Sequence, residues 1–279
     1  SEMCIRDRAA ACDLTVVVIG GYGIRSDWGL RTYGESADRP SVDFYGRQTE
    51  LVRALVETGR PVVAVIVNGK PLNNEWITAH VPAIVDAWEP GMYGGQAVAE
   101  ILFGKVNPSG KMPVTVPRHA GQIPMYYYQA ASRYWTGYGL GSSREDDRPA
   151  FCFGHGLSYT SFEYSDLKAD SVCPATGSIR LSFRLKNTGR MTGKEVPMVF
   201  VRDCVSSVVT PVNLLKEFTK VELRPGEERV IEFRIPAERL GLWNEDMKYV
   251  TEPGEFVLSV GRSVEDIRLK TTVRVLQTE

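Results

Sequence analysis

A glutamate in a glycine-rich loop is the residue of this sequence best suited to acid/base chemistry. Glu35 follows Gly34 directly, and Asp38 and Arg39 complete the pattern Glu-x-x-Asp-Arg. The loop follows a predicted parallel strand, and such loops carry the functional side chains of α/β proteins. A carboxyl group that burial or a nearby negative charge keeps protonated can serve as a general acid. From spacing alone, a solvated loop carboxylate is the favoured interpretation of Glu35, with Asp38 and Arg39 fixing a turn by charge-assisted bonds.

Other patterns that could carry chemistry are weaker. Gly20, Gly21 and Gly23 follow a strand, but their spacing is wrong for a dinucleotide loop and no helix follows. The three histidines are too dispersed to predict a metal cluster. The five cysteines are odd in number and form no Cys-x-x-Cys pair, which predicts core fillers or surface thiols rather than a disulfide framework.

Composition limits the partners. The chain has 279 residues, of which 43% are hydrophobic and 24% charged, as in a packed globular protein of one large domain or two ordinary ones. Its net charge of −1 argues against nucleic acid and against an anionic membrane surface, because both select basic patches. No apolar run reaches the ~20 residues of a membrane helix.

The first half alternates strands and helices. Continuous β-branched runs predict strands, the first of them buried on both faces, at Leu14–Ile19, Pro61–Val67 and Ala83–Trp88. Helical spacing of apolar residues predicts helices at Gln48–Glu57, Asn74–Ala79 and Gly94–Phe103. This order predicts a mostly parallel sheet between helices, with ligand loops at the carboxyl ends of its strands.

After about Asp166 the apolar period changes to two. Alternating segments, separated by Asn-Thr-Gly, Arg-Pro-Gly and Glu-Pro-Gly turns, predict strands at Ile179–Lys186, Val196–Arg202, Arg229–Ile235 and Glu255–Val260. About seven such strands describe an antiparallel sandwich of immunoglobulin or fibronectin type III kind. Val205–Pro211 is predicted to be a less regular connection.

An ordered series of motifs carries a family resemblance. The series runs Gly34-Glu-Ser-Ala-Asp-Arg39, Gly46-Arg-Gln48, Asn68-Gly-Lys-Pro71, Ala87-Trp-Glu-Pro-Gly91, Asn107-Pro-Ser-Gly-Lys-Met-Pro113, Phe151-Cys-Phe-Gly-His-Gly-Leu-Ser-Tyr-Thr160, Lys186-Asn-Thr-Gly189, Gly193-Lys-Glu195 and Leu242-Trp-Asn244. From Ala10 to Arg262, in this order, the chain resembles glycoside hydrolase family 3.

The resemblance implies a fold of class α/β plus all-β. A truncated α/β sandwich domain at residues 9–164 would be followed by a fibronectin type III-like β-sandwich at 165–279. Residues 1–8, which read as neither signal peptide nor amphipathic helix, are expected to be a non-native artefact. The family's catalytic (β/α)8 barrel, on the same polypeptide, would be missing, so the fragment alone is expected to be inactive.

The resemblance also assigns roles. Glu35 matches the acid/base of a retaining exo-β-glycosidase acting on β-D-glucosides or β-D-xylosides, with Asp38 and Arg39 in support. The family's nucleophile lies in a Ser-Asp-Trp motif of the barrel. Here the tripeptide that ends at Trp28 stands in a loop of the other domain, so Asp27 is expected to be a residue of the active-site rim or a plain loop residue, and the nucleophile is absent. Trp28 and Tyr33 could stack on a sugar ring, because aromatic faces suit the apolar side of a pyranose, although ordinary packing within the loop is the favoured alternative.

Several points stay open at the level of sequence. The family uses no metal or cofactor, and its substrates are oligosaccharides or aryl β-glycosides. His155 is expected to be a buried hydrogen-bonding residue, and the tyrosines 126–128 with Tyr134 and Trp135 either core or a loop at the site's mouth. A non-catalytic carbohydrate-binding or adhesive module and an orphan fragment without activity are the alternatives. The expected location is periplasmic or secreted. Glucoside and xyloside specificity cannot be separated.

Overall fold

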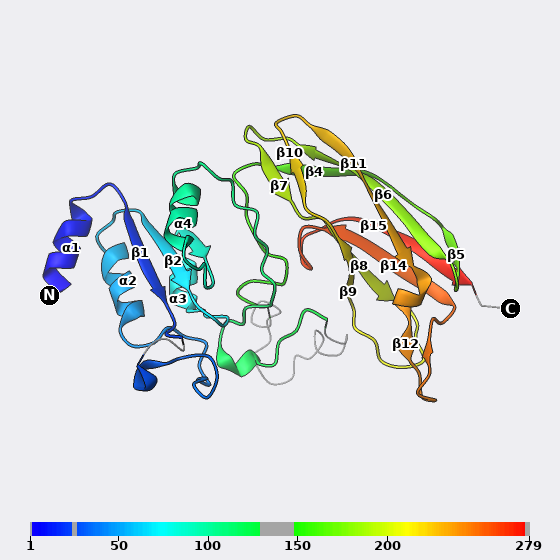
Figure 1. The fold of residues 1–279 in the computed structure, drawn as a ribbon, viewed down its shortest axis with the longest axis horizontal. Coiled ribbons are helices and arrows are strands. Elements are labelled where there is room, and N and C mark those ends of the chain that lie inside the picture. The colour runs from blue at the N-terminus through cyan, green and yellow to red at the C-terminus, as the bar shows by residue number, and fades with distance from the viewer. Residues whose placement is uncertain (1, 24–26, 129–147, 277–279) are drawn as a thin grey trace. The chain divides into compact units, whose positions relative to one another are not determined.

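Two compact units make up the chain, and they interleave along the sequence. The computed structural model describes residues 2–23, 27–128 and 148–276 (Figure 1). Of the described residues, the first unit comprises 2–23, 27–106, 115–125 and 148–151, and the second comprises 107–114, 126–128 and 152–276. Segments 107–114 and 152–164, placed in the α/β half by their sequence, therefore pack with the sandwich. The sequence-based boundary near residue 165 stays a prediction.

The first unit is built on a parallel three-stranded sheet in the order β1-β2-β3. Its elements are α1 (Glu2–Ala10), β1 (Thr15–Gly20), η1 (Trp28–Leu30), α2 (Gln48–Val56), β2 (Val62–Val67), α3 (Glu75–His80), β3 (Ala83–Asp86), α4 (Gly94–Leu102) and η2 (Ala120–Gln122). The strand and helix types match the sequence-based expectations, with boundaries shifted by a few residues. Helix α3 begins after Asn74 because the Asn74 side chain caps it, accepting a hydrogen bond from the nitrogen of Ile77 at 3.2 Å.

Two features of this unit differ from the sequence prediction. Strand β1 is buried on one face only, since Val16 and Val18 are exposed while Val17 and Ile19 lie in the core with α2 and α3. A run of β-branched residues cannot by itself reveal whether a second layer covers the strand. The segment at the amino terminus, for which no helical period was found, forms α1, and its Ala9 joins the same core.

The second unit is a mainly antiparallel β-sandwich, in which, of the described strands, only β5 and β15 pair in parallel, with a main core and a smaller cluster around Val196, Met198 and Phe200. One sheet has the order β11-β6-β4 and the other β5-β15-β14-β8-β9. Its elements are β4 (Phe162–Ala169), β5 (Val172–Pro174), β6 (Ser178–Asn187), β7 (Gly193–Glu195), β8 (Met198–Asp203), β9 (Leu214–Phe218), β10 (Val221–Leu223), β11 (Glu228–Pro236), η3 (Ala237–Leu240), β12 (Leu242–Trp243), β13 (Tyr249–Val250), β14 (Gly254–Gly261) and β15 (Ile267–Leu276). Alternation along β6 puts Ile179, Leu181, Phe183 and Leu185 inward, as period two predicts.

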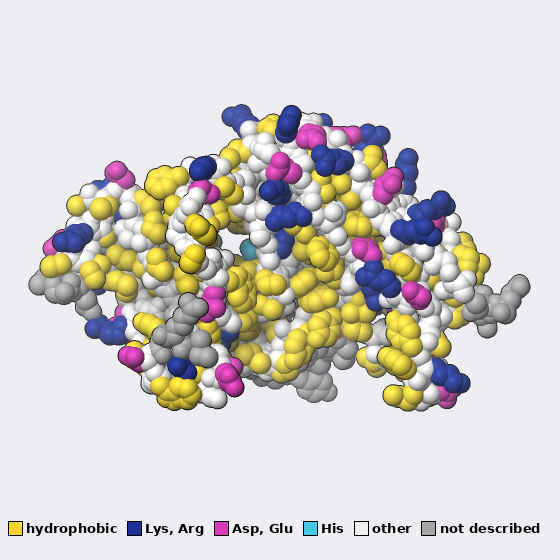
Figure 2. All heavy atoms as spheres, in the orientation of Figure 1, with side chains coloured by type: hydrophobic (Ala, Val, Ile, Leu, Met, Phe, Trp, Pro, Cys, Tyr) yellow, Lys and Arg dark blue, Asp and Glu magenta, His cyan; other side chains and the backbone are white. Residues whose placement is uncertain are grey.

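A buried carboxylate ties segment 107–114 to this sandwich. Glu195, at the end of β7, is 1% exposed and accepts from Lys111 at 3.0 Å and from Arg262 at 2.8 Å. Its Oε1 also accepts from the nitrogen of Val196 at 2.8 Å. Two cations and a backbone donor offset the cost of burying the charge. On the visible surface, basic and acidic side chains are interspersed, in keeping with the near-zero net charge (Figure 2).

Candidate active site

The loop that carries Glu35 leaves the sheet at the carboxyl end of β1, and one amide side chain fixes both of its ends. Gln48, the first residue of α2, accepts from the nitrogen of Gly20 at 2.7 Å and donates to the oxygen of Gly20 at 2.9 Å. A Cβ at Gly20 would lie 1.7 Å from the carbonyl oxygen of Val67, so a side chain there would separate β1 from β2. The loop 21–47 is therefore closed at its base.

Thr32 and Tyr33, which precede Glu35 in the sequence, anchor the loop through hydrogen bonds. Thr32 is 2% exposed, and its Oγ1 accepts from the nitrogen of Tyr22 at 2.8 Å while its own nitrogen donates to the oxygen of Tyr22 at 2.8 Å. The hydroxyl of Tyr33 donates to Oε1 of Glu89 at 2.6 Å. These bonds connect the approach to Glu35 with both the start of its own loop and the loop that follows β3.

The ring of Tyr33 lies in a cradle of three glycines. A Cβ at Gly21, Gly23 or Gly69 would come within 2.7, 2.9 and 2.2 Å of the Tyr33 side chain, respectively. Burial raises the pKa of Tyr33 to about 12, and the bond to Glu89 and its negative charge act in the same direction. The ring is thus packed against backbone at three points, which gives Tyr33 a positioning role. Its expected place at the substrate rim stays a prediction.

Glu35 itself stands on a sharp turn with its side chain exposed. Gly34 has φ +99° and Ser36 φ +58°, both in the left-handed region, and the nitrogen of Ala37 donates to the oxygen of Gly34 at 3.1 Å. A non-glycine residue rarely adopts such a φ, and conformations of this kind recur where a functional side chain is held out from the backbone. The turn therefore holds the Glu35 carboxyl out toward solvent.

The carboxyl-terminal side of the motif is held by a lysine and an aromatic ring. Nζ of Lys70 donates to the oxygen of Arg39 at 2.8 Å, and the Arg39 guanidinium lies 5.1 Å from the centre of the Tyr45 ring. Burial lowers the pKa of Lys70, with the charge of Asp38 opposing and that of Arg39 reinforcing the shift. Asp38 is exposed. The structure brings Glu35, Asp38 and Arg39 into one loop with both flanks fixed.

The tripeptide that mimics a nucleophile motif lies near the start of the same loop. Asp27 is exposed and precedes the short helix η1, and Ser26 lies outside the described residues. Trp28 is 68% exposed, and the Arg31 guanidinium lies 4.4 Å from the centre of its ring. Arg31 therefore occupies one face of the indole. Stacking of a sugar on Trp28 stays a prediction.

A second carboxyl group, at the carboxyl end of the parallel sheet, was not singled out by the sequence reasoning. Asp86 ends β3, and its Oδ1 accepts from the nitrogen of Trp88 at 3.2 Å. Burial raises the pKa of Asp86, the shift that a general acid needs, although the backbone bond opposes it. The signal that could have found it is its place at the carboxyl end of a parallel strand.

Residues whose roles the sequence left open differ in burial within the second unit. Tyr127 stacks on Phe153 at 4.2 Å and packs against Phe200, whereas the rings of Tyr126 and Tyr128 are about half exposed. Tyr134 and Trp135 fall outside the described residues. His155 is half-buried, and burial lowers its pKa, with help from nearby cations.

Across the described ranges, no three His, Cys, Asp or Glu side chains gather so that they could hold a metal ion. In the same ranges, no helix is long and apolar enough to cross a membrane. None of the five cysteines, all of which lie in the described ranges, forms a disulfide; Cys152 and Cys173 are buried, and Cys4, Cys12 and Cys204 are exposed.

Comparison with known proteins matches two parts of the chain to family models. Residues 4–159 match the family model "Glycosyl hydrolase family 3 C-terminal domain", and residues 195–264 match "Fibronectin type III-like domain". Two similar curated proteins are a β-xylosidase of Formosa agariphila and a periplasmic β-glucosidase of Salmonella typhimurium. The first is 41% identical over 93% of this chain and 35% of the relative, and the second 37% over 85% and 32%.

Solved structures give the same picture. A β-glucosidase of Erythrobacter marinus aligns with a TM-score of 0.88 at 36% identity, over 99% of this chain and 36% of the other. A β-glucosidase of Listeria innocua in complex with glucose aligns with a TM-score of 0.89 at 28% identity, over 99% and 38%. The chain thus spans about a third of the length of the curated relatives it matches.

Proposed function

The chain belongs to glycoside hydrolase family 3, and on that premise we propose that it is the acid/base-bearing part of a retaining exo-β-glycosidase. The substrates would be terminal β-D-glucosides or β-D-xylosides, the two classes named among its relatives. Retaining cleavage needs one carboxylate to attack the anomeric carbon and a second carboxyl to protonate the leaving oxygen. Glu35 supplies the second, with Asp38 and Arg39 maintaining the loop.

The observation that carries this proposal is the construction of the Glu35 loop. Its base is closed by Gln48, its approach is anchored through Tyr33, and its far side is held by Lys70, while the Glu35 side chain stays exposed. A carboxyl that must reach a glycosidic oxygen needs a fixed backbone and an open side chain, because misplacement by about 1 Å can cost ~10²-fold in rate.

The nucleophile is proposed to come from a barrel domain of the same polypeptide, since the matched relatives are about three times as long as this chain. The 279-residue chain alone should then not hydrolyse aryl β-glycosides, because no glycosyl-enzyme can form. A periplasmic or secreted location is proposed by analogy with the Salmonella relative, and cell fractionation would test it.

The test of the role of Glu35 uses the full-length enzyme with two leaving groups. Glu35→Gln keeps the size of the side chain but removes the proton donor, so glycosides with poor leaving groups should react ~10²–10⁴-fold more slowly. Dinitrophenyl glycosides need no protonation and should still form the glycosyl-enzyme. Asp86→Asn serves as the comparison, because burial raises the pKa of Asp86 and makes it the alternative candidate for the general acid. A leaving-group dependence seen for Asp86→Asn, and not for Glu35→Gln, would move the role to Asp86.

A further inference from the structure

The β-sandwich contains a pocket of about 270 Å³ that the proposed catalytic role does not use. Its floor is apolar and consists of Val201 from β8, Leu214 from β9 and Phe256 from β14. Val201 and Phe256 are almost fully buried in the sandwich core, so the floor is rigid. The pocket belongs to the second compact unit, whereas Glu35 belongs to the first.

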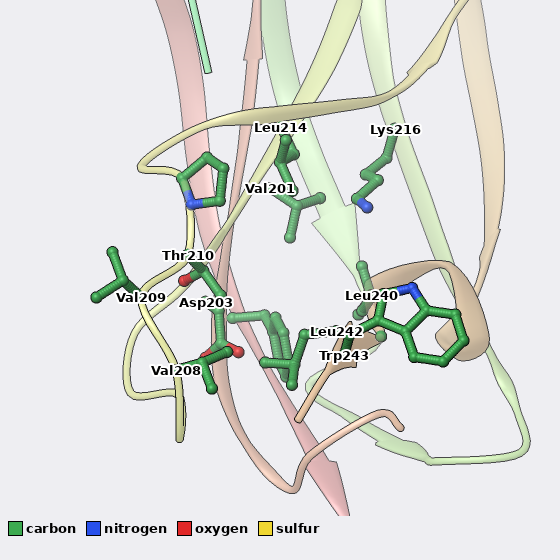
Figure 3. A pocket seen from close by; sticks show the side chains of 13 residues that line it. Val201, Asp203, Val208, Val209, Thr210, Leu214, Lys216, Leu240, Leu242 and Trp243 are labelled. Carbon is green, nitrogen blue, oxygen red and sulfur yellow. The ribbon is translucent and has the colours of Figure 1, made fainter. Parts of the chain in front are cut away.

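Two walls of different character flank this floor. On one side, Val209 and Thr210 come from the irregular connection between β8 and β9, and on the other Trp243 comes from β12 (Figure 3). The connection is tied to the segment between β13 and β14, because the nitrogen of Ser207 donates to Oε2 of Glu252 at 2.9 Å. The side chain of Trp243 is 61% exposed, and its ring packs on Tyr249 at 5.6 Å. An indole is therefore fixed at the mouth with much of its surface open.

A carboxylate and an ammonium group also line the pocket. Asp203 accepts one hydrogen bond, from the nitrogen of Val205 at 3.2 Å, and Nζ of Lys216 donates to the oxygen of Arg239 at 2.5 Å. No salt bridge joins Asp203 to Lys216 in the described part of the chain. Burial raises the pKa of Asp203 and lowers that of Lys216, so both groups are partly desolvated. Each keeps hydrogen-bonding capacity, since a carboxylate offers about four acceptor sites and an ammonium three donors.

This combination matches the chemistry of a sugar ring. The C–H face of a pyranose stacks on an aromatic ring, while its hydroxyls donate to a carboxylate and accept from an ammonium. The volume lies just below the ~300–1,000 Å³ of pockets that take drug-sized ligands, which suits one ring rather than a chain. A purely apolar ligand would leave Asp203 and Lys216 desolvated without new partners, which is costly.

We propose that this pocket is a non-catalytic saccharide site that binds one neutral pyranose unit, stacked on Trp243 and hydrogen-bonded by Asp203 and Lys216. The site goes beyond the proposed hydrolysis and does not depend on it, because binding requires neither Glu35 nor a nucleophile. Its effect would be to hold a sugar end on the sandwich of a glycoside hydrolase.

The test is a binding titration of the 279-residue chain with D-glucose, D-xylose and cyclohexanol, followed by ligand-observed NMR. We expect saturable binding of at least one sugar with a Kd of ~1–10 mM, and weaker binding of cyclohexanol. Trp243→Ala should weaken sugar binding at least ~10-fold, and Asp203→Asn ~5-fold or more. Phe218→Ala is the matched control, because Phe218 is a strand residue of the same sandwich with 63% exposure that does not line the pocket.

Asp203→Asn replaces only one carboxylate oxygen by an amide nitrogen. This variant therefore still tests the proposal if Trp243→Ala does not fold. No saturable sugar binding would overturn the proposal. So would binding that survives both Trp243→Ala and Asp203→Asn, or cyclohexanol binding more tightly than either sugar. The proposal would equally be overturned if Trp28→Ala lost sugar binding while Trp243→Ala and Asp203→Asn kept it. That result would place the sugar at the Glu35 loop. Each result is independent of whether Glu35 acts as acid/base.

Discussion

Two glutamates in this chain face opposite environments. Glu195 is 1% exposed and is bound by Lys111, Arg262 and a backbone nitrogen. Glu35 stands on a turn between two left-handed residues with its side chain exposed, while its neighbours carry the loop's bonds. The carboxylate of Glu195 is held by ion pairs and a hydrogen bond to its own oxygens. The carboxyl group of Glu35 is positioned through the backbone of the turn that carries it.

The environment of each carboxyl group, rather than its residue type, distinguishes a structural role from a catalytic one. A buried carboxylate bound by two cations cannot reach a substrate, and its removal leaves two partly buried positive charges without this partner. A carboxyl group on a fixed loop, with its side chain exposed, keeps its oxygens accessible to a reacting atom. Substitutions at Glu195 should therefore change stability, and substitutions at Glu35 should change catalysis with little change in stability.

The largest effect on stability is expected for Glu195→Gln. Loss of the charge removes the buried partner of the partly buried Lys111 and Arg262, so the free energy of unfolding should fall by about 3–5 kcal/mol. Urea denaturation of the wild-type chain and the variant measures this change in the free energy of unfolding. Glu222→Gln is the control, since Glu222 pairs with Lys194 at 3.4 Å on the surface and should cost about 0–1 kcal/mol. Equal losses in the two variants would remove the distinction between the two environments.

A smaller loss is expected when the cradle of Tyr33 is filled. Gly69→Ala places a methyl group 2.2 Å from the Tyr33 ring and should lower the free energy of unfolding by about 1–3 kcal/mol. Gly95→Ala is the control, because its Cβ would meet nothing within 4 Å and helix α4 should gain ~0.5–1 kcal/mol. The loss should shrink in a Tyr33→Ala background, as a double-mutant cycle would show. An undiminished loss would mean that the ring is not the obstacle.

The smallest effect is expected for Tyr33→Phe, which removes only the bond to Glu89. The cost should be about 0.5–1.5 kcal/mol at neutral pH. The folded chain holds the Tyr33 proton more tightly than the ordinary pKa of 10.0, with a pKa of about 12. Its contribution is therefore complete below pH 10 and is lost as the pH rises through about 12.

Unfolding of wild type and Tyr33→Phe across this range of pH provides the measurement. Tyr93→Phe is the control, since Tyr93 is 73% exposed. A stability gap between wild type and Tyr33→Phe that widened above pH 10 would contradict the hydrogen bond to Glu89, because the sign would then be reversed.

The sequence predicted the parts of this fold that depend on local pattern. The strands β1, β2 and β3, the capped helix α3 and the alternating strand β6 lie close to where periodicity predicted them. The exposure of Val18 and the packing of segment 107–114 with the sandwich could not be predicted, because both depend on contacts between residues distant in sequence. The cradle of Tyr33 was hidden for the same reason, since it joins Gly21, Gly23 and Gly69 only in three dimensions.

Azide rescue of Glu35→Gln in the full-length enzyme tests the central claim most directly. With a dinitrophenyl β-glycoside, the variant should form the glycosyl-enzyme quickly and then stall, because the same carboxylate must deprotonate the attacking water. Azide is an anion that needs no base, so adding it should restore turnover and yield a β-glycosyl azide. Asp38→Asn should show no rescue. If azide leaves Glu35→Gln unchanged while activated and poor leaving groups lose rate alike, then Glu35 is not the acid/base and the account fails.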